Sequence, residues 1–175
     1  MAKKRTHFLV EGLFGFEGRM RRSEFWMLNI GIGAIKFVLA LVIGGAMGLG
    51  MGDQQGLFVR LGLDALFFWP ALAFAVKRGH DRNRPAAFSI GLTAVITGMA
   101  LWLVFLSASV TAAAGAADMG MVAVIGIASL IYIALLIYWF VDYGCLDGTK
   151  GRNRFGASPK GLKGPGDKDL SEAFA

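Results

Sequence analysis

The chain has 175 residues, of which 55% are hydrophobic and 17% are charged. Soluble globular chains have about 45–50% apolar and about 25% charged residues, so this composition leaves too little polar surface for a water-soluble fold. The net charge of +6 does not predict nucleic acid as a partner, because the positions of the basic residues are explained by membrane topology. The length fits one domain.

Residues 1–24 are basic and polar, and we expect them to lie in the cytoplasm or on the membrane interface. Four apolar segments follow, each close to the roughly 20 residues that cross a hydrocarbon core about 30 Å thick. The predicted fold is therefore all-α, a polytopic membrane protein with four transmembrane helices in two hairpins. The predicted transmembrane domain is 25–143, with helices at 25–50, 57–76, 86–109 and 121–141, and residues 144–175 form a cytoplasmic tail.

The first predicted helix carries glycine at every fourth position near its end, at Gly44, Gly48 and Gly52. Small residues at this spacing give a smooth face on which another helix can pack closely. We expect a helix-packing site here, either within the chain or between copies in a homo-oligomer.

Ionisable residues interrupt the first two predicted helices. At about 1.5 Å per residue, Lys36 and Asp64 lie roughly 15 and 18 Å from the inner ends of their helices. Charged groups at such depth are costly, so they are usually paired or functional. We predict an intramembrane ion pair that either orients the two helices or takes part in ion or proton movement. Pro70 predicts a kink in the second helix.

The basic residues give the orientation. All 18 Lys and Arg residues except Lys36 and Arg60 lie beside the same ends of the predicted helices. Cytoplasmic loops carry such an excess, so we expect both termini in the cytoplasm. The segment 78–85 (RGHDRNRP) is then a cytoplasmic turn between the two hairpins, and anionic lipid headgroups are the expected partners of its charges.

Each segment on this side carries an Arg-x-Arg element. Guanidinium groups bind phosphate through paired hydrogen bonds. These elements either set the topology with non-specific lipid contacts or converge into a defined anion pocket. They are Arg19 with Arg21, Arg82 with Arg84, and Arg152 with Arg154.

The sequence predicts no catalytic residue, metal site or cofactor. His80 and Asp81 are adjacent, but a general base needs a positioned substrate and partner, so we expect Asp81 to form salt bridges. The lone Cys145 excludes an intramolecular disulfide, and neither histidine has cysteine neighbours at zinc-ligand spacing.

Three motifs occur in order: FEGRMRRSEFW, WPALAFAVKRGHDRNR and GTKGRNRFGASP. Together they resemble the bacterial membrane family named domain of unknown function 805, over about residues 14–159. The resemblance implies a four-helix, multi-pass protein of the inner membrane, with the motif residues on the cytoplasmic side and no assigned activity. The chain departs from the family at Gly79, where Leu is usual, and at 84–87 (RPAA), where Ser-Gly-Trp is usual. The matching positions are Gly18, Arg19, Arg22, Phe25, Trp26, Pro70, Arg78, His80, Asp81, Gly151, Asn153, Arg154, Phe155, Gly156 and Pro159.

Three functions remain open. We favour a structural or partner-binding membrane component with a basic cytoplasmic face. The first alternative is a small transporter or channel that uses Lys36 and Asp64. The second is a membrane enzyme or a binder of anionic headgroups at the motif cluster of Arg19, Arg22, Arg78, His80, Asp81, Asn153 and Arg154.

Overall fold

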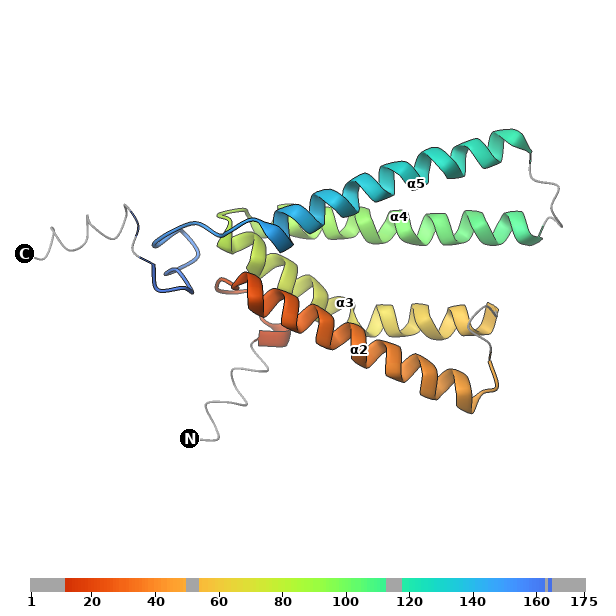
Figure 1. The fold of residues 1–175 in the computed structure, drawn as a ribbon, viewed down its shortest axis with the longest axis horizontal. Helices are drawn as coiled ribbons and strands as arrows, with labels where there is room; N and C mark the ends of the chain where they lie inside the picture. Colours follow the sequence, from red (N-terminus) through yellow and green to blue (C-terminus); the bar gives the residue numbers. More distant parts are fainter. Residues whose placement is uncertain (1–11, 50–53, 113–117, 163, 165–175) are drawn as a thin grey trace, which may run out of the picture.

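The computed structural model describes residues 12–49, 54–112, 118–162 and 164 (Figure 1). Its long helices are α2 (Arg22–Ala46), α3 (Gln54–Asp81), α4 (Ala86–Ala112) and α5 (Met119–Trp139). The last continues as the π-helix η1 (Phe140–Cys145). Four helical spans are long and apolar enough to cross a membrane. The all-α, membrane-spanning fold expected from the sequence is confirmed.

The four helices form two pairs, α2 with α3 and α4 with α5, and α3 also contacts α4. The pairs converge at one end and separate toward the other (Figure 1). We call the convergent end, made of residues 12–21, 77–89 and 138–162, the basic end. The described residues both begin and finish there, so the polar segments before α2, between α3 and α4 and after η1 meet at this end.

The second helix extends further than its apolar run suggests. The sequence predicts 57–76, whereas α3 continues to Asp81, so the first half of the RGHDRNRP segment is helical and only 82–85 form the turn. The helix closes through bonds from the Arg82 and Arg84 amides to the Gly79 carbonyl, at 3.0 and 2.9 Å, and Asn83 has a φ of 59°. A left-handed residue just past the last turn is a common helix ending.

Pro70 lies inside α3, and α3 bends along its length (Figure 1). Proline removes one backbone hydrogen bond and its ring pushes against the preceding turn, which kinks a helix. The bend lets the final turns of α3 approach α4 and η1, so it helps to bring the charged residues of 77–81 to the centre of the basic end.

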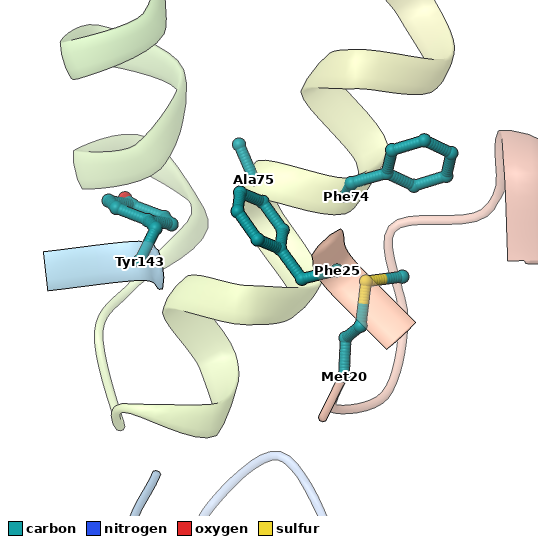
Figure 2. Packing of buried hydrophobic residues seen from close by; sticks show 5 residues of the cluster. All are labelled: Met20, Phe25, Phe74, Ala75 and Tyr143. Atoms are coloured by element: carbon teal, nitrogen blue, oxygen red, sulfur yellow. The ribbon is translucent and has the colours of Figure 1, made fainter. Parts of the chain in front are cut away.

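The buried apolar core lies at the basic end and not in the middle of the bundle. Figure 2 shows Phe25 of α2 between Tyr143 of η1 and Phe74 of α3, with Met20 and Ala75 beside them. Elsewhere large apolar side chains point outward, for example Phe105 at 71% exposure and Leu130 at 69%. In water such surfaces would mark binding sites or aggregation, but hydrocarbon chains solvate them. The packed core therefore forms where the helices leave the membrane.

Candidate functional site

Asp81, at the last residue of α3, is the centre of a buried polar cluster. Its side chain is only 5% exposed and accepts salt bridges from Arg19 at 2.9 Å and from Arg78 at 2.6 Å. Arg78 is one helical turn before Asp81, so the helix itself places this pair together. Arg19 arrives from the segment that precedes α2. A buried carboxylate of this kind is tolerated because it is paired and hydrogen-bonded.

The remaining donors of Arg19 hold the C-terminal segment. Its guanidinium donates to the Thr149 and Gly151 carbonyls at 2.6 and 2.7 Å, and to the Gly156 carbonyl at 3.2 Å. These carbonyls belong to residues that follow η1. One arginine therefore ties three parts of the chain together, namely the segment before α2, the end of α3 and the segment after η1.

Arg78, which is also buried, likewise holds separate segments of the chain together. It is 1% exposed, and it donates to the carbonyls of Tyr143 at 2.8 Å, Met20 at 3.4 Å and Leu146. The hydrogen bonds of Arg19 and Arg78 go to a carboxylate, to the Thr149 hydroxyl and to backbone carbonyls inside the fold. These two predicted anion-binding residues therefore serve internal structure.

Residues 148–153 pack directly on Asp81. The Thr149 amide and hydroxyl both donate to the Asp81 carbonyl, at 2.8 and 3.0 Å, and the Asn153 side-chain amide donates to the His80 carbonyl at 2.9 Å. A Cβ added to Gly148 would lie 1.8 Å from an Asp81 carboxylate oxygen, so only glycine fits there. We call Arg19, Arg78, Asp81, Thr149 and Asn153 the Asp81 cluster.

A second buried carboxylate, Asp142, was not predicted. It lies in η1, 3% exposed, and binds Arg82 at 3.1 Å and Arg84 at 2.9 Å. Burial alone would lower the pKa of the Arg84 guanidinium, but its hydrogen bond to the Tyr138 hydroxyl and its proximity to Asp142 raise the pKa. The π-helical turn places Asp142 toward the turn at 82–85. An α-helical pattern read from the sequence does not reveal that this residue lies on that side of the helix.

The structure leaves no room for a side chain at position 79, where the family resemblance implies a leucine. A Cβ there would lie 2.1 Å from the Ser89 hydroxyl oxygen. That hydroxyl accepts a hydrogen bond from the Tyr143 hydroxyl at 2.9 Å, and both residues are fully buried. In this chain the space of a side chain at position 79 is taken by the polar contact between α4 and η1.

Beside the Asp81 cluster the protein surface is hollowed, with a volume of about 650 Å³. We call this the basic-end hollow. His80 lines it, 6% exposed, and its ring stacks on Phe155 with 3.8 Å between centroids. His80 Nδ1 lies 3.2 Å from the Gly18 carbonyl oxygen, whereas its buried Nε2 has no hydrogen-bond partner among the described residues. The other lining residues are Phe16, Glu17, Gly18, Pro85, Ala86, Arg154 and Phe155.

The structure brings together most of the predicted motif cluster. Arg19, Arg78, Asp81 and Asn153 share one hydrogen-bonded cluster, and His80 and Arg154 line the hollow next to it. Arg22 lies apart from them, exposed and bonded to the Cys145 carbonyl at 2.8 Å. Within the described ranges, no group of three or more His, Cys, Asp or Glu side chains is arranged to hold a metal ion.

The predicted intramembrane contact between Lys36 and Asp64 is present in the structure. It is not enclosed, since the two side chains are 33% and 57% exposed. A second hollow of about 420 Å³ between α2 and α3 includes both residues, together with Arg60 and Gly33. We call it the intramembrane hollow.

The glycine face predicted for the first helix is not formed as expected. Gly44 lies in α2 and lines the intramembrane hollow, but α2 ends at Ala46 and Gly48 has a φ of +66° beyond it. Gly52 lies outside the described residues. A helix that stops before Gly48 cannot present these residues as one helical face.

The residues that form the basic end agree with a known family. The family described as "Protein of unknown function (DUF805)" matches residues 13–157. The inner membrane protein YhaI of Escherichia coli K12 is 28% identical over 155 residues, which cover 87% of this chain and 92% of YhaI. The uncharacterized protein YiiR of the same strain is 28% identical over 173 residues, or 93% of this chain and 98% of YiiR. No solved structure matches the chain. With four membrane-spanning helices and the three motifs gathered at one end, this chain belongs to the DUF805 family of integral inner-membrane proteins.

Proposed function

We propose that the protein is a structural membrane component that pairs with a second copy of itself through the α2–α3 face around Lys36 and Asp64. The observation that carries this proposal is the exposure of the Asp64 side chain, 57%, at a depth where the surroundings are hydrocarbon. In this role the basic end rests on the predicted cytoplasmic surface. Its exposed cations, such as Arg21 and Lys150, contact anionic headgroups there.

The depth follows from helix geometry. Lys36 is ten residues before the end of α2 and Asp64 is ten residues after the start of α3. At 1.5 Å per residue both lie about 15 Å from the helix ends opposite the basic end. The hydrocarbon core is about 30 Å thick, so the pair sits near the bilayer centre.

A charge at this depth costs about 2.5–3.5 kcal/mol on insertion scales, and charged residues there normally face protein or water. Pairing Lys36 with Asp64 offsets part of that cost, but the outer sides of both groups still face lipid. A second copy related by a two-fold axis would place its own Lys36 and Asp64 against this pair, so that each carboxylate faces two ammonium groups.

The shape of the face also favours a close partner. Gly33 and Gly45 line the intramembrane hollow, and a Cβ built on either would meet nothing within 4 Å. Small residues let a neighbouring helix approach and pack in membranes, where no hydrophobic effect drives association. A side chain from a second copy therefore has room to enter the hollow.

The test is cysteine cross-linking in native membranes, in a Cys145→Ser background. Phe37 and Leu41 are exposed, 56% and 47%, and line the hollow, so Phe37→Cys and Leu41→Cys should form covalent dimers. The matched control is Ile127→Cys on α5, which is 61% exposed. Phe37 and Ile127 lie about 12–14 Å from the helix ends opposite the basic end, so their depths in the membrane match.

Dimers from α2 but not from α5 would support the proposal, and adding Asp64→Asn should weaken them. Equal cross-linking at all three positions would indicate random collisions, and none at Phe37 or Leu41 would contradict self-association through this face. A different membrane protein that cross-links to these cysteines in place of a second copy would replace the homodimer by a heterologous partner.

Transport is the second candidate, because the ion pair lines a hollow of about 420 Å³. Asp64→Asn would then abolish flux of an ion or proton in proteoliposomes while leaving cross-linking intact. The structural proposal expects the reverse, since removing the carboxylate charge weakens the contact between copies.

A further inference from the structure

We propose that the basic-end hollow binds a phosphate ester that carries an ammonium group, as in the headgroup of phosphatidylethanolamine. This inference is independent of the contact between copies, because the hollow lies at the basic end, away from Lys36 and Asp64. Its arguments are position, charge, an unpaired histidine nitrogen and aromatic lining.

The hollow lies where the helices leave the membrane. Ala86 is the first residue of α4 and Pro85 directly precedes it, while Gly18 lies a few residues before α2. A lipid in the same leaflet has its phosphate at this level, so its headgroup can enter while its acyl chains remain beside the helices. The first turn of α4 also presents backbone N–H groups and a positive dipole end, which favour a phosphate.

The charges of the hollow favour a zwitterion over a simple anion. Its lining contains one guanidinium, Arg154, and one carboxylate, Glu17, both on exposed residues. Arg19 and Arg78, which the sequence suggested for an anion pocket, are bonded to Asp81 instead. Arg154 can pair with a phosphate through two hydrogen bonds, whereas Glu17 repels a second negative charge and attracts an ammonium group.

His80 adds an unpaired acceptor. Its Nδ1 lies against the Gly18 carbonyl at 3.2 Å, so Nδ1 carries the proton that is donated to that oxygen. In a neutral imidazole the other nitrogen then accepts hydrogen bonds. That nitrogen, Nε2, is buried without a partner among the described residues, on a side chain that lines the hollow. A buried acceptor without a donor is costly, and an ammonium or hydroxyl group of a ligand can supply that donor.

Two aromatic rings complete the lining. Phe155 is stacked on His80, and Phe16 packs edge to face on Trp69 with 5.0 Å between ring centroids. Ring faces attract cations by cation–π interaction, and Phe16 is the ring left for an ammonium group of the ligand, because His80 and Arg154 already cover Phe155. The Arg154 guanidinium already lies over the Phe155 ring, 4.7 Å from its centroid, so the position of the phosphate-binding group is fixed by the same ring.

The experiment measures lipid binding to the full chain by native mass spectrometry. Phosphatidylethanolamine is compared with phosphatidylglycerol, which has the phosphate without the ammonium group, and with soluble phosphoethanolamine. We expect the protein to bind phosphatidylethanolamine roughly five- to tenfold more tightly than phosphatidylglycerol, the size of one added charged contact. Binding of soluble phosphoethanolamine alone would support the same chemistry and assign the site to a soluble ester.

The variants separate the two charges. Arg154→Ala should weaken both lipids, whereas Glu17→Gln should remove the preference for phosphatidylethanolamine without weakening phosphatidylglycerol. Arg152→Ala is the matched control, because Arg152 is exposed on the same segment and does not line the hollow. Equal affinity of the wild type for both lipids, stronger binding of phosphatidylglycerol, or the same loss with Arg152→Ala would overturn the proposal. Unchanged thermal unfolding of the variants confirms that they are folded.

Discussion

Two carboxylates of α3, Asp64 and Asp81, each meet cations, but their surroundings differ. The Asp81 side chain is 5% exposed and has two arginine partners, whereas the Asp64 side chain is 57% exposed and has Lys36 alone. Arg19 and Arg78 also bind carbonyls of distant segments. The Asp81 cluster therefore holds one chain together, while the Asp64 pair leaves bonding capacity directed outward.

The comparison also explains where each cluster lies along the helix. A fully paired cluster needs several chain segments, and among the described residues these meet at the basic end, where the segments before α2, between α3 and α4 and after η1 gather. In the hydrocarbon region the neighbours are helices with apolar surfaces, so a charged pair there finds few internal partners. Charged groups at this depth normally face protein or water, and our proposal assigns the open side of the Asp64 pair to a second copy of the chain.

The largest effect is expected from Asp81→Asn. It leaves two buried guanidinium groups without their carboxylate, and breaking a buried ion pair by removing one partner costs about 3–5 kcal/mol. The measurement is unfolding of the purified protein in mild detergent, followed by circular dichroism.

Asp147→Asn is the control, because Asp147 is a carboxylate of the same end whose side chain is 63% exposed. We expect its unfolding curve to overlay that of the wild type. Similar curves for Asp81→Asn and the wild type would show that the Asp81 cluster does not hold the C-terminal segment.

A smaller loss is expected from Gly79→Ala. The new methyl would lie 2.1 Å from the Ser89 hydroxyl oxygen, and overpacking of this kind costs about 1–3 kcal/mol. The double variant Gly79→Ala/Ser89→Ala removes the colliding oxygen and should recover part of the loss, although Tyr143 then lacks its acceptor. The midpoint of thermal unfolding measures both, and no recovery in the double variant would mean that the strain lies in the α3 backbone.

Much of the architecture could be predicted from the sequence, because hydrophobic run length and the placement of Lys and Arg are strong signals. The convergence of the three basic segments was one of the two alternatives that the sequence left open. The hydrogen-bond partners within the site could not be predicted from the sequence. Nothing in the order of residues shows that Arg19 binds Asp81 and backbone carbonyls of 149–156. Those bonds depend on how the C-terminal segment folds back.

Asp142 and the end of α3 show two other limits. Asp142 follows an apolar run and gives no signal of burial, because the π-helical turn changes which side of the helix it faces. The charged residues 77–81 suggested a turn, whereas their charges are compensated inside the fold and the helix continues. The sequence did hint at the partners of Asp142, though not at its burial, because an acid just after the fourth apolar run is predicted on the same side of the membrane as the basic turn at 82–85.

The pair at Asp64 should behave in the opposite way to Asp81. In Lys36→Leu/Asp64→Leu, two charges in a low-dielectric region are replaced by apolar groups, which is often neutral or stabilising. We expect the unfolding curve of the monomer in detergent to stay within about 1 kcal/mol of the wild type, while dimer formation in membranes falls. A large loss of monomer stability would indicate that the pair orients α2 and α3 within one chain.

The smallest effect is expected at the exposed contact between Lys160 and Asp147, 2.7 Å apart. The hydrogen bond from Lys160 lowers the pKa of the Asp147 carboxyl, so Lys160→Ala should raise that pKa toward its ordinary value. The measurement is a pH titration of the carboxyl carbon by NMR.

A folded-state pKa below the unfolded one gives stability that is present above the unfolded pKa and is lost as pH falls through the folded pKa. At an exposed pair this contribution is small and screened by salt, so unfolding at neutral pH should not change. If Lys160→Ala instead destabilised the protein as much as Asp81→Asn, the C-terminal segment would be held at its surface by Lys160 and not from beneath by Arg19.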